Sequence, residues 1–310
     1  MKTVFIDGGA GTTGLRIVER LSARRDITLL TLPDALRKDT QARKDALNRA
    51  DIAFLCLPDA AAIEAVSLIE NDRTVVIDTS TAHRCDAHWT YGFPELVGRD
   101  KVASSKRIAN PGCHASGFVA LIAPLVSAGL LAPSAALTAF SLTGYSGGGK
   151  AMIAEYESAD RNSLLDAPRQ YGIKQMHKHL PEMQMQSGLM IYPVFSPIVA
   201  PYYSGMEVTV PLFTRDLNCS KKEAMIEIEA IYRSTYTGDV VRFAENNDEN
   251  GFLSASAMSG NDAMTVSVYG NEERILLVSR FDNLGKGASG AAIQNMNLVL
   301  ACDETEGLVL

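Results

Sequence analysis

The first third of the chain alternates short apolar runs with stretches of helical periodicity. Segments with helical spacing separate four apolar runs, at 3–6, 27–32, 51–57 and 74–80. Such alternation predicts strand–helix–strand units, and consecutive units of this kind form a parallel sheet with helices on both faces. We therefore expect residues 1–113 to form an α/β domain of the Rossmann-like class.

The pattern changes beyond Pro133. Strand-like stretches lie farther apart, and a helical segment at 220–236 stands among polar loops. This spacing predicts an α+β domain with a largely antiparallel sheet over residues 114–283. The tail, 284–310, is helical again and rich in small residues. We expect it to pack closely and to rejoin the first domain.

The composition argues against several classes of protein. A formal net charge of −7 is the wrong sign for non-specific nucleic-acid binding. No apolar stretch reaches the roughly 18 residues of a membrane span, and the N-terminus carries no secretory pattern. The five cysteines are odd in number and widely spaced, which does not suit a disulfide framework. We expect a cytoplasmic protein with reduced thiols and a small-molecule substrate.

A glycine-rich turn, FIDGGAGTTGLRI, connects the first expected strand to the first expected helix. It fits both G-x-G-x-x-G and G-x-x-G-x-x-G. Glycines let a backbone turn sharply and approach a pyrophosphate, which then binds amides at the helix N-terminus. The alternative is an ordinary tight turn, but the strand before it and the helix after it favour dinucleotide binding. The expected cofactor-binding residues of the turn are Gly8, Gly11, Thr12, Thr13 and Gly14.

The choice between NAD and NADP depends on the residues after the second strand. Asp34 lies near the distance at which an acidic residue binds the ribose of NAD, but it follows Pro33. Arg37 and Lys38 come next, and two cations there suit a 2′-phosphate. The alternative for this pair is a solvated loop. We expect NADP.

The segment NPGCHASG places Cys113 between a Pro-Gly pair and a long apolar helical pattern. At a helix start, backbone amides and the helix dipole favour the thiolate, which is the reactive form. Most free cysteines are inert core residues, but this setting favours a nucleophile. A thiolate beside a nicotinamide indicates acyl transfer to sulfur, followed by hydride reduction of the thioester.

A histidine is expected to move the proton in such a reaction. The segment KQMHKHLPEMQ contains His177, His179 and Glu182. If it is extended, its two histidines point to opposite faces. A metal site is an alternative, but no compact second ligand pair accompanies them, and we expect no metal. His83 and His88 are interpreted as surface histidines.

Taken together, these motifs resemble the N-acetyl-gamma-glutamyl-phosphate reductases of arginine biosynthesis, and most closely the shorter variety of that family. The matching stretches follow the family order over nearly the whole chain: FIDGGAGTTGLRI, IDTSTAHR, WTYGFPEL, NPGCHASG, GYSGGGK, KHLPEM and DNLGKGASGAAIQNMNLVL. The resemblance implies that Cys113 forms the thioester and that His177 is the acid/base. It also implies NADPH as cofactor, N-acetyl-glutamyl phosphate as substrate and Asn283 near the nicotinamide.

The same resemblance places His179 and Glu182 near the substrate. Arg84 and Lys150 are the candidate cations for its phosphate or carboxylate, with a surface charge as the alternative for each. Two other functions remain open: an aspartate-semialdehyde dehydrogenase-like enzyme, and a dinucleotide-binding regulator without catalysis. Whether the substrate amine is acetylated or bound to a carrier protein is also open. By analogy with the fold family, we expect a homo-oligomer, either a dimer or a tetramer.

Overall fold

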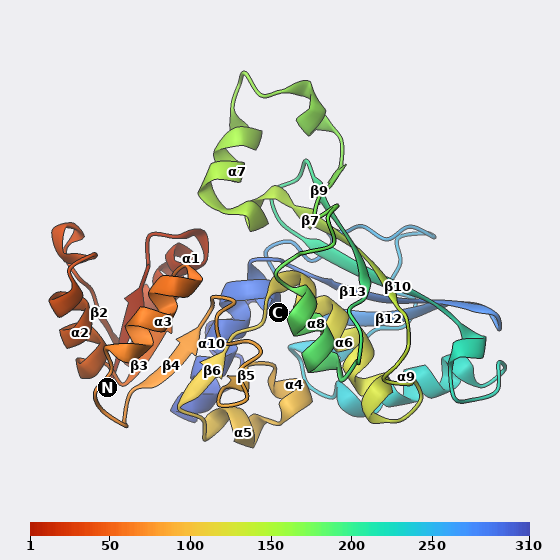
Figure 1. Ribbon diagram of the computed structural model, residues 1–310, viewed down its shortest axis with the longest axis horizontal. Coiled ribbons are helices and arrows are strands. Elements are labelled where there is room, and N and C mark those ends of the chain that lie inside the picture. Colours follow the sequence, from red (N-terminus) through yellow and green to blue (C-terminus); the bar gives the residue numbers. More distant parts are fainter. The chain divides into compact units, whose positions relative to one another are not determined.

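The computed structural model describes residues 1–310, and the chain divides into two compact units (Figure 1). Unit 1 comprises Met1–Gly112 and Ala288–Leu308, and unit 2 comprises Cys113–Gly287 and Val309–Leu310. Compared with the expected limits, Cys113 opens unit 2 instead of closing unit 1, and the chain returns to unit 1 at Ala288 instead of at residue 284. Every helix is too short or too polar to cross a membrane.

Unit 1 is built on a six-stranded sheet in which every neighbouring pair is parallel. The two central strands β3 and β4 are buried along their whole length, as expected where helices cover both faces. In sheet order the strands are β2 (Ile27–Leu30), β1 (Lys2–Asp7), β3 (Ile52–Leu55), β4 (Val75–Asp78), β6 (Arg107–Ala109) and β5 (Thr90–Tyr91).

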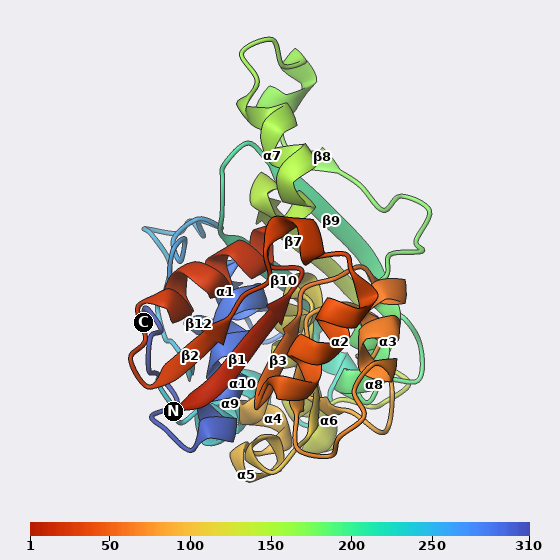
Figure 2. The same cartoon turned by 90° about the vertical axis from the view of Figure 1, so that its left-hand side faces the viewer.

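Helices cover this sheet from two sides, as Figure 2 shows for the N-terminal strands. On one face, Ile17 and Leu21 of α1 share a core with Ile293 and Met296 of α10. On the other face, α2 and α3 bury alanines and Leu47. The helical segments of unit 1 are α1 (Thr12–Ser22), η1 (Asp34–Leu36), α2 (Thr40–Arg49), α3 (Asp59–Ser67), α4 (Pro94–Val97), α5 (Arg99–Ala103) and α10 (Gly290–Leu300).

Unit 2 contains a seven-stranded mixed sheet. Four of its six neighbouring pairs are antiparallel, while β11 with β12 and β7 with β9 are parallel. The prediction of a largely antiparallel sheet is therefore confirmed. In sheet order the strands are β11 (Val241–Phe243), β12 (Met264–Gly270), β13 (Arg274–Phe281), β10 (Met206–Phe213), β7 (Thr138–Gly144), β9 (Val194–Ala200) and β8 (Arg169–Gln170).

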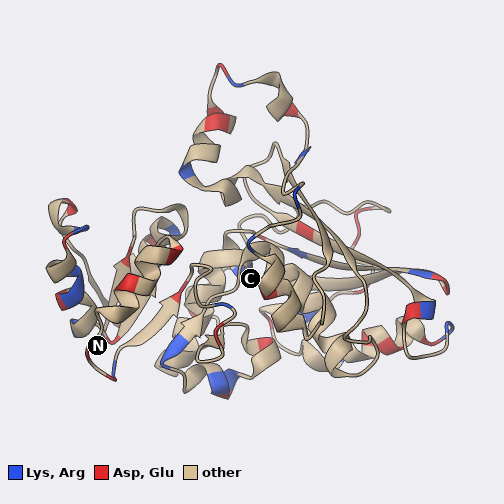
Figure 3. Ribbon diagram, in the orientation of Figure 1, with Lys and Arg blue, Asp and Glu red and all other residues tan.

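One long helix, α6 (Cys113–Ser127), forms the centre of unit 2. It carries no charged side chain (Figure 3) and packs against the sheet and against α8 and α9. A Cβ added at Gly117 would lie 2.5 Å from Val208 Cγ2, so a glycine allows the helix to approach the sheet this closely. The other helical segments are η2 (Tyr145–Gly148), α7 (Gly149–Glu157), η3 (Ser163–Asp166), α8 (Leu180–Ser187), η4 (Thr214–Asp216), α9 (Ala224–Thr235) and the π-helical η5 (Gly285–Ser289).

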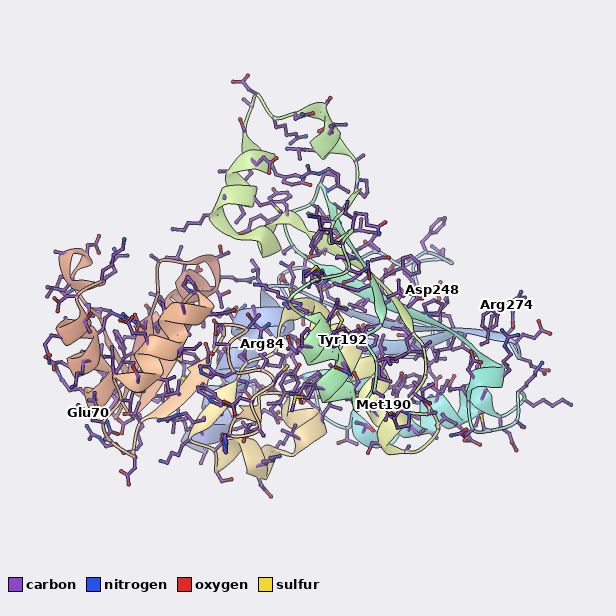
Figure 4. All side chains as sticks on the ribbon, viewed as in Figure 1. Glu70, Arg84, Met190, Tyr192, Asp248 and Arg274 are labelled. Atoms are coloured by element: carbon purple, nitrogen blue, oxygen red, sulfur yellow. The ribbon has the colours of Figure 1, made fainter.

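The second face of this sheet exposes apolar side chains. Along β10, buried and partly exposed residues alternate, because only one face meets the helices. The large apolar side chains exposed on the strands are Phe140, Val194, Phe213 and Leu276. Arg274, at the start of β13, extends away from the sheet beside them (Figure 4).

Candidate active site

The glycine turn of unit 1 has the backbone that a phosphate-binding turn requires. Gly8 adopts a φ of +83°, and a Cβ there would lie 2.3 Å from the carbonyl oxygen of Cys56. A Cβ at Gly14 would lie 2.7 Å from the carbonyl oxygen of Gly8. Gly11 is the N-cap of α1, whose first turn contains no acidic side chain. The amides at this helix start therefore provide a site for an anion.

A cavity of about 810 Å³ lies beside this turn. One wall is apolar and includes Leu29, Leu30 and Leu57, while Arg37 and Lys38 provide positive charge. Arg37 forms an ion pair with the exposed Asp34. An apolar wall, two cations and the helix amides fit the adenine, the 2′-phosphate and the pyrophosphate of NADP.

A buried ion pair, which the sequence patterns did not reveal, also lines this cavity. Arg43 of α2 lies with Nη2 3.0 Å from Asp7 Oδ2 and donates a 2.9 Å hydrogen bond from Nη1 to Glu64 Oε2. Burial raises the pKa of Asp7, although Arg43 acts in the opposite direction. The pair ties the end of β1 to α2 next to the glycine turn.

Arg84 lies in the loop that follows β4 (Figure 4) and is buried. Its guanidinium donates hydrogen bonds to the carbonyl oxygens of Asn110, at 2.9 Å, and Thr79, at 2.8 Å. The interpretation of His83 as a surface histidine was wrong. Its Nδ1 lies 2.6 Å from Asp78 Oδ2, and its ring stacks on Trp89 with a centroid separation of 4.0 Å.

Cys113 is the first residue of α6 and is half-buried. A Cβ added at Gly287 would lie 3.0 Å from Cys113 Cβ, so η5 passes close to Cys113. Tyr171 is also near. Burial raises the pKa of its hydroxyl, and the charge of Cys113 raises it further. The thiol therefore lies at a helix N-terminus, and the Tyr171 phenol keeps its proton at neutral pH.

His114, the next residue, was not singled out from the sequence. Its Nδ1 lies 2.7 Å from Ser141 Oγ and its Nε2 lies 2.6 Å from Tyr171 Oη, so both ring nitrogens have partners. Burial, followed by the charge of the nearby His177, lowers the pKa of His114 to about 3. The imidazole is therefore neutral at pH 7.

The expectation that His177 and His179 point to opposite faces was wrong. The segment is a turn, closed by a hydrogen bond from Leu180 N to the His177 carbonyl, and α8 begins at Leu180 with Pro181 in its first turn. The two rings lie 4.8 Å apart, and their centroids are 5.5 and 5.6 Å from that of His114.

The environments of these histidines differ. Burial, followed by the charge of Lys178, lowers the pKa of His177 to about 4. His179 is buried at the N-cap of α8, and Glu182 is buried in its first turn. Unit 2 thus gathers the predicted His177, His179 and the unpredicted His114 around one point.

The two remaining predicted residues of unit 2 lie in different surroundings. Asn283 is buried, donates a 2.9 Å hydrogen bond to Ser146 Oγ and accepts one of 2.9 Å from Gly205 N. It therefore fixes the turn after β7. Lys150 is exposed near the start of α7, which projects from unit 2 in both ribbon views (Figures 1 and 2). No group of three His, Cys, Asp or Glu residues is arranged to hold a metal ion.

Comparisons with known proteins assign the family. The chain is 42% identical to N-acetyl-gamma-glutamyl-phosphate reductase 2 of Nostoc sp., an alignment that covers 98% of both chains. It is 44% identical to N-acetyl-gamma-glutamyl-phosphate reductase of Brucella ovis, over 96% of this chain and 98% of that protein. The chain belongs to the N-acetyl-gamma-glutamyl-phosphate reductase family. The resemblance inferred from the motifs is thereby confirmed.

Family models match both parts of the chain, and solved structures share its fold. Residues 113–283 match the semialdehyde dehydrogenase dimerisation domain, and residues 34–105 match the semialdehyde dehydrogenase NAD binding domain. Aspartate semialdehyde dehydrogenase II of Vibrio cholerae superposes with a TM-score of 0.72 at 18% identity, over 97% of this chain and 98% of that one. The structure of aspartate semialdehyde dehydrogenase with NADP from Candida albicans superposes with a TM-score of 0.63 at 14% identity, over 96% of this chain and 99% of that one. These likenesses confirm the expected two-domain fold.

Proposed function

We propose that the chain catalyses the NADPH-dependent reductive dephosphorylation of N-acetyl-L-glutamyl 5-phosphate to N-acetyl-L-glutamate 5-semialdehyde, a reaction of arginine biosynthesis. The observation that carries the proposal is the full-length similarity to curated reductases of this name. The chemistry of unit 2 supports it, because α6 begins with the thiol of Cys113, and the ring of the next residue, His114, lies beside those of His177 and His179.

The reaction starts at Cys113. Its thiolate attacks the acyl carbon, and phosphate leaves as the thioester forms. When bound, NADPH supplies the hydride that reduces this thioester. The resulting thiohemiacetal collapses, so the carbon–sulfur bond breaks, the aldehyde leaves and the sulfur regains a proton.

His177 is the proposed acid/base. With a pKa of about 4 it is neutral at pH 7 and is able to accept the thiol proton. The imidazolium that results is a strong acid in this half-buried setting, and it returns the proton to the departing sulfur. His179, 4.8 Å away between ring centroids, is the alternative for this role.

The cofactor is assigned to unit 1. The residues that would hold it are the turn glycines with Thr12 and Thr13, together with Arg37 and Lys38 for the 2′-phosphate. The 810 Å³ cavity and the amides of α1 support this assignment. Arg37→Ser with Lys38→Ser is expected to weaken NADPH binding at least tenfold and to leave NADH binding unchanged.

Substrate binding is proposed for Arg84, Lys150, His179 and Glu182, and a position near the nicotinamide for Asn283. His179 is supported by its place at the N-cap of α8, next to His114 and His177, and Glu182 by its burial in the first turn of that helix. The Arg84 guanidinium is supported as a rigid cation, because two backbone carbonyls fix it.

The decisive assay is the reverse reaction. Purified protein is mixed with N-acetyl-glutamate semialdehyde, phosphate and NADP, and the absorbance of reduced nicotinamide is followed. A phosphate-dependent rise supports the proposal, and Cys113→Ser is expected to abolish it while NADPH binding persists. A rise only with aspartate semialdehyde would show that this compound, and not N-acetyl-glutamate semialdehyde, is the substrate. NADPH binding without any turnover would instead support the non-catalytic regulator.

We also propose that the chain forms a homo-oligomer through the open face of the sheet of unit 2. That face exposes Phe140, Val194, Phe213 and Leu276, and residues 113–283 match a dimerisation domain. Sedimentation velocity is expected to show a dimer or a tetramer, and Leu276→Glu is expected to yield monomers. A cytoplasmic location is proposed because all five cysteines are free thiols, which a reducing compartment maintains.

A further inference from the structure

We propose that the guanidinium of Arg43 is a cofactor-binding group, which provides the flat surface on which the adenine base of the dinucleotide stacks. The inference rests on the proposed function, because it concerns the cofactor assigned to unit 1. It gives the base a group of its own, separate from Arg37 and Lys38, which are assigned to the 2′-phosphate.

Two carboxylates on different elements hold the Arg43 side chain. Its Nε donates a 3.1 Å hydrogen bond to Asp7 Oδ2 at the end of β1, and its Nη1 donates one of 2.9 Å to Glu64 Oε2 of α3. Its Nη2 lies 3.0 Å from the same Asp7 oxygen. Arg43 itself belongs to α2 and is 7% exposed. Three elements of unit 1 therefore fix the orientation of the guanidinium.

These contacts use the rim of the guanidinium and not its faces. The group is planar and its N–H bonds lie in that plane, so the hydrogen bonds to the carboxylates form at its edges. A fork of N–H groups is what binds a phosphate, and Asp7 and Glu64 already engage it. Arg43 also lines the 810 Å³ cavity, where a ligand is therefore offered a flat cationic face. Such a face stacks on aromatic rings.

The charge around Arg43 also favours a neutral ring over a phosphate. Two carboxylates accompany one cation, so the group of three carries no net positive charge, whether or not the buried Asp7 is ionised. A phosphate monoester carries about two negative charges at pH 7, and Glu64 would repel it. Adenine is uncharged. The 2′-phosphate is better matched by Arg37 and Lys38, which line the same cavity.

The cavity also has an apolar surface for the second face of a base. Leu32 and Leu57 line it, and both pack against the core that contains Leu47 of α2. Helices α2 and α3 lie side by side there (Figure 2). A volume of about 810 Å³ is typical of small-molecule sites. One cavity of unit 1 thus combines a fixed planar cation with leucine side chains, which suits a purine ring.

The test compares two cofactors that share the base, because only NADPH carries the 2′-phosphate whereas NADH lacks it. Arg43→Lys keeps a cation for Asp7 and Glu64 but removes the flat face. We expect it to weaken the binding of both cofactors by the same factor, about tenfold, in fluorescence titrations. The matched control is Arg49→Lys, the same change at an exposed position of α2, which should leave both affinities within about twofold of wild type. An equal loss there would overturn the stacking role.

A second measurement uses the wild-type chain. Nuclear magnetic resonance follows the Nε–H signal of Arg43, assigned by triple-resonance spectroscopy, while adenosine 2′,5′-bisphosphate is added. A purine stacked on the guanidinium places this proton over the ring, so the ring current is expected to move the signal upfield. Inorganic phosphate is the control probe and is expected to cause no upfield shift. This readout depends neither on turnover nor on the folding of a variant.

The outcomes separate this inference from the proposed function. A loss of affinity in Arg43→Lys that is confined to NADPH would assign Arg43 to the 2′-phosphate and overturn the stacking role. So would an Nε–H signal that does not move upfield with adenosine 2′,5′-bisphosphate. If wild type binds neither cofactor, the cofactor assignment is wrong and the inference falls with it. If wild type binds both but shows no turnover, the proposed reaction fails, while the same two readouts still decide the stacking role.

Discussion

Two glycines of the same turn are expected to differ in how replacement by alanine affects stability. A Cβ at Gly14 would lie 2.7 Å from the carbonyl oxygen of Gly8 and 2.8 Å from Gly9 Cα, and neither backbone atom has room to move. At Gly11 the nearest atom would be 3.6 Å away, which is an ordinary contact. The fold therefore requires a glycine at 14 but not at 11, and a glycine at 11 has to be explained by a ligand.

The magnitudes follow from these contacts. Overpacking at Gly14 costs about 1–3 kcal/mol, and the gain in helix propensity, about 1 kcal/mol, offsets only part of it. At Gly11, an alanine N-cap costs about 0.5 kcal/mol, and the reduced freedom of the unfolded chain returns a similar amount. We expect the free energy of unfolding of Gly11→Ala to lie within about 0.5 kcal/mol of the wild-type value. Its affinity for NADPH should fall at least tenfold, or about 1.4 kcal/mol, because a methyl group occupies the approach of the pyrophosphate.

Urea unfolding followed by circular dichroism measures the stability, and fluorescence titration with NADPH measures the affinity. Gly14→Ala is the comparison, since it should lose stability as well as affinity. Unchanged NADPH binding by Gly11→Ala would show that the pyrophosphate does not approach this turn. A loss of stability equal to that of Gly14→Ala would show that the turn is more crowded than the contacts indicate.

Three further predictions concern stability. Arg43→Leu leaves the Asp7 carboxylate buried without its cation and is expected to lower the free energy of unfolding by about 3 kcal/mol; in a urea titration, a loss below about 1 kcal/mol would contradict this. The pKa of His114, about 3, lies below its ordinary 6.5, so the unfolded chain takes up a proton that the native state excludes and stability falls as the pH drops below 6.5. At pH 5 this lowers the free energy of unfolding by about 2 kcal/mol relative to pH 7. Urea titrations at both pH values measure this difference, and in His114→Gln it should be smaller by about the same amount. Gly117→Ala brings a Cβ to 2.5 Å from Val208 and is expected to cost about 1–3 kcal/mol, with an unchanged melting temperature as the contrary result.

Local signals in the sequence predicted the parts of the fold that depend on them. The glycine turn, the first four strands of unit 1 and the start of α6 at Cys113 follow from period, glycine placement and Pro111. The short strands β5 and β6 were not predicted. Strand β9 was not predicted, because Pro197 interrupts its pattern. That proline is tolerated in a strand whose β8 partner is only two residues long.

The site residues that sequence reasoning missed depend on contacts distant in the chain. His114 gains its significance from Ser141 and Tyr171, which follow it by 27 and 57 positions. Arg43 likewise meets Asp7 from 36 positions away. Only His114 had a neighbour in the sequence that could have indicated its importance, because it directly follows Cys113 in NPGCHASG.

The place of α10 in unit 1 has a consequence for the order in which the chain acquires its structure during synthesis. Residues 1–112 emerge from the ribosome before Ile293 and Met296, which complete one of their cores. Closing so long a loop costs on the order of 5 kcal/mol in chain entropy. Unit 2 removes that cost once it is folded, because its ends, Cys113 and Gly287, are in contact. The second unit is thus expected to fold before the first is complete, so Cys113 and the histidines of unit 2 are in place before the sheet of unit 1 gains its last helix.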